Sequence, residues 1–244
     1  MTPGLLRQTL TVLQKELHIE VRQPARISGI FFFALALVLM VAFAAPSTGS
    51  LRQQAGGTLW IGLLLASTRS LDQSYAVETE TDALGGLSLW PVDSKALFYG
   101  KALANTLILV TVALGLLPMI VAVYDAPVAG MSLADLMSFP PGGAHAGELG
   151  MILVFLFVGC AALAAPGTLY GLISAEARGS SVLLPLLMFP LVVPALLAAS
   201  RGTTVLFEGD PMGDAPNWLG VLAGFAALHW SISGLLYGRI VEDS

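Results

Sequence analysis

The sequence predicts an all-α integral membrane protein with six transmembrane helices. Hydrophobic residues make up 56% of the 244 residues and charged residues only 11%, against a usual charged share of about 25%. The few charges lie between long uncharged runs. A transmembrane helix needs about 20 apolar residues, and a helix supplies the internal backbone hydrogen bonds that lipid requires. The uncharged runs are 27–51, 53–68, 102–124, 149–175, 179–200 and 215–238. They account for most of the chain, so residues 1–244 predict a single transmembrane domain.

The segment before the first run, residues 4–22, predicts an amphipathic helix in the membrane interface, ending at Gln23-Pro24. Four leucines recur along one helical stripe, and Lys15 lies on the opposite face. These are Leu6, Leu10, Leu13 and Leu17. An ordinary juxtamembrane tail is the alternative.

Two of the six runs differ from a simple apolar span. The second is short, but Arg69 and Asp72 follow it at i, i+3 spacing, so a pair between them at the interface would extend the helix by a turn. The fifth carries three prolines that should bend it. These are Pro185, Pro190 and Pro194.

Pairs of glycines at GxxxG spacing predict close helix packing. They are Gly167/Gly171, Gly220/Gly224 and Gly234/Gly238.

The distribution of Lys and Arg predicts the orientation in the membrane. Nine of the eleven lie in segments that six spans place on one side, together with both termini, and only Arg52 and Arg201 lie on the other. The positive-inside rule assigns the side with nine to the cytoplasm. The segment 125–148 has no Lys or Arg, as expected of an external loop.

The largest cytoplasmic connection, residues 73–101, combines acidic and apolar side chains. Glu78 and Asp82 share a helical face at i, i+4, and Glu80 lies elsewhere. Leu84 and Leu87 add apolar contact area. A short acidic helix of this kind beneath the membrane could dock a soluble partner. A solvated loop is the alternative.

Two motifs in the chain resemble the CcmB family, the haem exporter B subunit of bacterial cytochrome c maturation. The first is Glu78 followed by ALGGLSLWPVDSKALFYGKALAN over residues 83–105. The second is APGTLY at 165–170, then Arg178, then LLPLLMFPLVVP at 183–194. The resemblance extends over the whole chain in length, span number and loop lengths. Thr79 and Thr81 stand where a basic residue is common in the family, which makes the connection more acidic.

The resemblance implies a membrane subunit of an ABC transporter of the bacterial inner membrane. It would pair with a separate ATPase, CcmA, and work beside the membrane subunits CcmC and CcmD and the periplasmic haem chaperone CcmE. Two copies are expected, because ABC ATPases act as dimers. Residues 4–22 would be the elbow helix, and the connection 73–101 would carry the coupling helix that meets the ATPase.

The chain lacks the motifs of several chemistries. It has no G-x-x-x-x-G-K-[ST] for ATP and no Cys-x-x-Cys-His for covalent haem, so we expect ATP on the partner subunit and no catalytic or metal residue here. Its single cysteine, Cys160, lies within an apolar run and cannot form an intrachain disulfide. The net charge of −5 argues against nucleic acid as a binding partner. His145 in the external loop and His229 in the last span are the candidate axial haem ligands. The favoured interpretation of His145 is a solvated loop residue, and that of His229 is a packed intramembrane polar group.

Three functions remain open at this point. The first is a permease that couples ATP hydrolysis to haem delivery or to release of the haem-loaded chaperone. Release is favoured because the spans offer few haem ligands. The others are an ABC exporter of a lipid or glycan and a membrane scaffold that only assembles other proteins.

Overall fold

The computed structural model describes residues 4–45, 48–80, 93–127, 146–176 and 183–243. Every regular element in these ranges is an α-helix. The helices are α1 (Leu5–Arg22), α2 (Pro24–Ala44), α3 (Thr48–Glu80), α5 (Ser94–Tyr124), α7 (Ala146–Glu176), α8 (Leu183–Phe207) and α9 (Ala215–Asp243).

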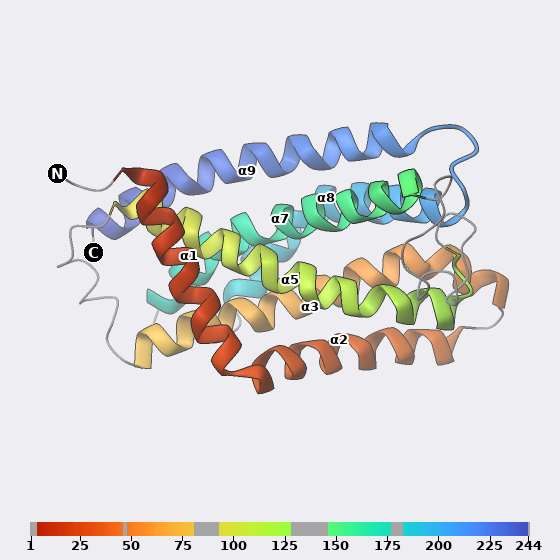
Figure 1. Ribbon diagram of the computed structural model, residues 1–244, viewed down its shortest axis with the longest axis horizontal. Coiled ribbons are helices and arrows are strands. Elements are labelled where there is room, and N and C mark those ends of the chain that lie inside the picture. Colours follow the sequence, from red (N-terminus) through yellow and green to blue (C-terminus); the bar gives the residue numbers. More distant parts are fainter. Residues whose placement is uncertain (1–3, 46–47, 81–92, 128–145, 177–182, 244) are drawn as a thin grey trace.

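Helices α2 to α9 run up and down as an antiparallel bundle, and α1 crosses the bundle at one end (Figure 1). Both termini lie at this end, which we call the terminal end; the opposite end is the far end. Pro24 begins α2 directly after α1, which suits a residue that has no backbone N–H to contribute to a first helical turn. The helix predicted over 4–22 is therefore present, and it lies at an angle to the bundle.

Five of the helices in the described part are long and apolar enough to cross a membrane. They are α2, α5, α7, α8 and α9. The predicted span 53–68 forms part of α3, which is not among the five. Helix α3 packs against α2, α5, α7 and α8, so protein rather than lipid covers most of its surface. Buried polar residues such as Thr58, Ser67 and Ser70 are tolerated better in that setting than on a lipid-facing helix.

Helix α3 is also longer at the terminal end than the sequence predicted. It continues to Glu80, so residues 73–80 extend the helix instead of beginning a separate connection. Helix α5 begins at Ser94, where the Asp93 side chain caps it by accepting a hydrogen bond from the Lys95 backbone N–H at 2.9 Å. Of the predicted connection 73–101, only residues 81–92 lie outside the described residues.

Close packing around α3 depends on glycines in the neighbouring helices. A Cβ on Gly159 would overlap Trp60, and a Cβ on Gly171 would lie 2.6 Å from the Tyr75 ring. Trp60 is 1% exposed and donates a hydrogen bond from Nε1 to Thr203 Oγ1 at 3.2 Å. These contacts tie α3 to α7 and α8.

The predicted glycine pairs differ in their surroundings. Gly167 and Gly171 are packed against α3 and α8, whereas a Cβ on Gly220 or Gly224 would meet no described atom within 4 Å. Pro190 and Pro194 lie inside α8, which is a single helix through Phe207. Arg69 makes a cation–π contact, with its guanidinium 5.3 Å from the centre of the Phe33 ring, and its charge also lies close enough to the Asp72 carboxylate to interact with it.

Candidate functional site: buried polar contacts beneath the N-terminal helix

The structure places only some of the residues predicted to act. Glu78 and Glu80 lie in the last turn of α3 at the terminal end. Asp82, Leu84 and Leu87 fall outside the described residues, and so does His145.

His229 lies on α9, with Nδ1 3.0 Å from the Phe225 carbonyl oxygen and its ring stacked on the Phe225 ring at 3.9 Å between centroids. The Phe225 carbonyl oxygen of the same helix therefore engages one of the two ring nitrogens of His229. The stacking contact with Phe225 also holds the His229 ring in place.

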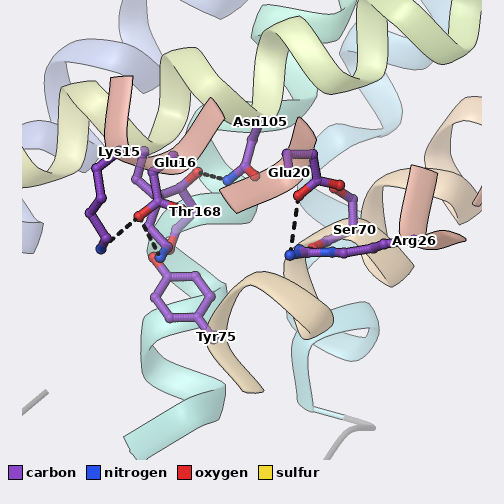
Figure 2. Close-up of polar contacts among 9 residues, drawn as sticks. Lys15, Glu16, Glu20, Arg26, Ser70, Tyr75, Asn105 and Thr168 are labelled. Carbon is purple, nitrogen blue, oxygen red and sulfur yellow. Dashed lines mark hydrogen bonds and ion pairs between the residues drawn. The ribbon is translucent and has the colours of Figure 1, made fainter. Parts of the chain in front are cut away.

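A buried lysine lies at the centre of a polar cluster at the terminal end. Lys101 on α5 is 1% exposed. Its Nζ lies 3.7 Å from Glu16 Oε1 of α1 and 4.5 Å from the centre of the Tyr75 ring of α3. Glu16 also accepts a hydrogen bond from Lys15 Nζ at 3.0 Å, as Figure 2 shows. A charge so deeply buried needs a counter-charge and polar contacts, and both α1 and α3 supply them to Lys101.

The same cluster joins three bundle helices through neutral side chains. The Tyr75 hydroxyl donates to the Thr168 carbonyl oxygen of α7 at 2.7 Å. Asn105 Nδ2 on α5 donates to Thr168 Oγ1 at 3.1 Å (Figure 2). Asn105 is 2% exposed and Thr168 is 0% exposed. An apolar substitution of either residue would therefore leave the polar group of the other buried without its hydrogen-bond partner.

A second ion pair connects α1 to α2 and α3. Glu20 Oε2 lies 3.2 Å from Arg26 Nη1. Arg26 in turn donates to the Ser70 carbonyl oxygen at 3.0 Å and to Gln73 Oε1 at 3.2 Å. Burial raises the pKa of Glu20 above its ordinary value, and the nearby Arg26 charge opposes this rise.

Backbone contacts hold α1 closely against α5. A Cβ on Gly100 would lie 2.6 Å from Val12 Cβ and 2.9 Å from the Thr9 carbonyl oxygen, so glycine permits the approach. Gln8 Oε1 accepts a hydrogen bond from the Asp93 backbone N–H at 2.9 Å, just before α5 begins. Helix α1 is therefore fastened to the starts of α2 and α5 and to the end of α3. A displacement of any of these segments must be shared with the others.

Sequence reasoning missed this cluster. It counted Lys101 as one more basic residue near the cytoplasm and did not consider Tyr75 as a polar contact. The available signal was Lys101 and Asn105 at i, i+4 spacing at the start of an apolar run, where both side chains face the same side of a helix.

Taken together, the fold and this cluster define a multi-pass helical membrane protein whose N-terminal helix is docked on the terminal end of its bundle. Among the described residues, no three His, Cys, Asp or Glu side chains are grouped so as to hold a metal ion.

Comparison with known proteins specifies the family. A model of the CcmB protein family matches residues 7–238. The chain is 30% identical over 217 residues to heme exporter protein B of Rhodobacter capsulatus, covering 88% of this chain and 90% of that protein. It is 31% identical over 202 residues to heme exporter protein B of Paracoccus denitrificans, covering 79% and 83%. The chain belongs to the CcmB family.

Proposed function

We propose that this chain is the transmembrane permease subunit of an ABC transporter in cytochrome c biogenesis. It would couple ATP hydrolysis by a separate ATPase, CcmA, to haem delivery or to release of the haem-loaded chaperone CcmE. The observation that carries the proposal is the match of the CcmB family over residues 7–238. The absence of a P-loop motif from the sequence agrees with an ATPase on another chain.

The proposal includes six membrane spans, with α3 as the sixth, in one domain over residues 1–244. The up-and-down order of the helices supports it, because α3 is antiparallel to α2 and α5 and extends over the length of the bundle (Figure 1). Nine of eleven Lys and Arg residues then lie on the side of the terminal end, counting those in the segments between helices. We assign that end to the cytoplasm on this charge distribution.

In this orientation the ATPase meets the terminal end. Glu78 and Glu80 in the last turn of α3, with Asp82, Leu84 and Leu87 after it, are the proposed docking residues. The start of α5 and helix α1, as the elbow helix in the membrane interface, lie at the same end of the bundle. CcmC, CcmD and a second copy of the chain are the proposed membrane partners.

Reversal of charge in the docking segment tests the coupling. The variant Glu78→Lys with Asp82→Lys should insert normally but fail to co-purify with the ATPase, because opposite charges across an interface would become like charges. Leu84→Asp should act similarly by placing a charge in an apolar contact. Asn217→Lys, an exposed change at the far end, is the control that should retain the ATPase.

The same cells distinguish the candidate functions by where covalent haem accumulates. If the energy is used for release, haem stays on the chaperone while mature c-type cytochromes disappear. Absence of haem from the chaperone would favour direct haem export through this subunit. Normal cytochromes despite loss of the ATPase contact would favour either the scaffold or a lipid or glycan exporter. Deletion of the whole chain separates these two, because it would abolish mature cytochromes only if the chain is the scaffold.

A further inference from the structure

One side of α3 is left uncovered toward the far end, between α2 and α8. Helix α2 packs on α1, α3 and α5, whereas α8 packs on α3, α7 and α9. In the described part of the chain α2 and α8 are not packed against each other. Between them Ile61 is 52% exposed, although its neighbour Trp60 is 1% exposed and Leu63 is 0% exposed. The gap therefore exposes the middle of an otherwise central helix toward the surrounding membrane.

This gap contains a cavity of about 750 Å³, within the range of about 300–1,000 Å³ typical of small-molecule sites. Its apolar lining includes Leu37 of α2, Ile61 of α3 and Leu197 of α8. Its polar lining consists of Gln53, Gln54, Thr58, Ser200, Arg201, Thr204 and Glu208. Because Gln53 and Gln54 lie in the second turn of α3 and Glu208 follows the end of α8, most polar groups lie nearer the far end and the apolar ones nearer the membrane centre. An amphiphile has the same arrangement of head and tail.

The wall formed by α3 and α8 is held firmly in place. A Cβ on Gly56 would overlap Thr204 Oγ1 and lie 2.8 Å from the Ser200 carbonyl oxygen, so the two helices are in close contact. Arg52 Nη2 donates to the Phe207 carbonyl oxygen at 3.1 Å and joins the start of α3 to the end of α8. A wall fixed by such contacts needs little reorganisation when a ligand binds.

The two charged groups of the cavity select its ligand. Arg201 and Glu208 are both exposed, and neither side chain forms an ion pair with another described residue. They are seven residues apart, and the Glu208 N–H still donates to the Thr204 carbonyl oxygen at 3.0 Å, so the rise of an α-helix places them about 10 Å apart. Both long side chains can turn toward the space between them. A head group that carries one anion and one cation satisfies both. A purely anionic head, or the two carboxylates of a porphyrin, would be attracted by Arg201 but repelled by Glu208.

We propose that this cavity binds a zwitterionic phospholipid from the membrane leaflet at the far end. Its phosphate contacts Arg201, its ammonium group contacts Glu208, and its acyl chains lie along Leu37, Ile61 and Leu197. The amides of Gln53 and Gln54 and the hydroxyls of Ser200 and Thr204 are available to the phosphate and ester oxygens. The inference stands on the cavity alone and does not depend on haem export.

Lipid retention by the purified protein tests the proposal. The full chain is reconstituted with equal amounts of phosphatidylethanolamine and phosphatidylglycerol, transferred to detergent, and the lipids that remain bound are counted by native mass spectrometry. We expect one phosphatidylethanolamine to be retained. Arg201→Gln and Glu208→Gln should each weaken it about tenfold, the effect of losing one charged hydrogen bond of about 1.5 kcal/mol. The exchange of charges, Arg201→Glu with Glu208→Arg, should weaken retention more than either single variant, because the acyl chains fix the order of phosphate and ammonium and the exchange places a carboxylate beside the phosphate.

Controls separate this site from lipids that merely surround the protein. Arg239→Gln and Asp125→Asn change exposed charged residues outside the cavity and should leave retention unchanged; Asn also tolerates the positive φ of 49° at position 125. Equal retention of phosphatidylglycerol, no effect of Arg201→Gln and Glu208→Gln, or displacement of the bound lipid by one equivalent of haem would each overturn the proposal. Displacement by haem would identify the cavity as a porphyrin site instead.

Discussion

The contact between Lys101 and Glu16 should make a large contribution to the stability of the fold. Replacing Lys101 with Met removes the charge but keeps an apolar stem of similar length. Removing one partner of a buried ion pair costs about 3–5 kcal/mol, because the other charge remains buried and unpaired. Glu16 retains Lys15 at 3.0 Å, so we expect the lower limit, about 3 kcal/mol.

Lys15 is the matched control for this prediction. It contacts the same carboxylate, but its side chain is 46% exposed, whereas that of Lys101 is 1% exposed. Pairs with exposed partners contribute about 0–1 kcal/mol, so Lys15→Met should have little effect. The double variant Glu16→Gln with Lys101→Met removes both charges of the buried pair. It should therefore be less destabilised than the sum of the single variants, by about 1–3 kcal/mol.

The single cysteine provides the assay. Cys160 is buried at 0% exposure, so a thiol-reactive fluorophore labels it only when the bundle opens. Labelling is followed during equilibrium unfolding in mixed micelles of increasing denaturing detergent, and the midpoint is compared among the variants. If Lys101→Met were no more destabilising than Lys15→Met, or if Glu16→Gln and Lys101→Met were additive, the ion pair would not be what stabilises this contact.

Three further predictions concern pH, packing and orientation. Burial raises the pKa of Glu20 above its ordinary 4.5, so the folded state holds that proton more tightly. The contribution of Glu20 to stability should therefore be largest below pH 4.5 and be lost as the pH rises through the raised pKa. Comparison with Glu20→Gln in the same unfolding assay should reveal this contribution as a difference between the two pH profiles, and identical profiles would contradict the assignment. Gly171→Ala should cost about 1–3 kcal/mol of stability by overpacking against the Tyr75 ring. Gly224→Ala is the control and should be neutral or stabilising, because a Cβ there meets no described atom within 4 Å. Equal effects of the two substitutions would refute the packing argument. In a cysteine-free background, an impermeant thiol reagent added to spheroplasts should label Met212→Cys, in the turn after α8 and 85% exposed, but not Ser94→Cys; the reverse pattern would invert the proposed orientation.

The sequence predicted the helices well because the membrane imposes a simple rule. A segment that crosses lipid must be apolar and helical over about 20 residues, and each predicted run lies within or largely overlaps an observed helix. The rule says little about where a helix ends outside the lipid. Residues 73–80 are rich in good helix formers and contain no Gly or Pro, so α3 continues although its hydrophobic run has ended.

The functional contacts could not be predicted in the same way. Lys101, Glu16 and Tyr75 come from three helices that are distant in the sequence, and helical periodicity determines only which residues share a face of one helix. The cavity could not be predicted for the same reason, because its lining also comes from helices that are distant in the sequence. Ile61 and Leu197 read as ordinary membrane-facing residues, and only the separation of α2 from α8 shows that they line one space.

Helix α3 connects all of these features. It is one continuous helix of 33 residues, about 50 Å long, and it is the only described helix that carries the proposed docking glutamates, Tyr75 of the polar cluster, and part of the cavity wall. A helix resists bending over such a length far more than two packed helices resist small sliding movements. If the ATPase docks near Glu80 as proposed, a force applied there would move α3 largely as a unit. Because Arg52, Gly56 and Trp60 join α3 to α8, α8 would follow, and the width of the gap between α2 and α8 would change. On this reasoning, a movement that begins at the proposed docking residues would reach a lipid bound in the cavity at the far end.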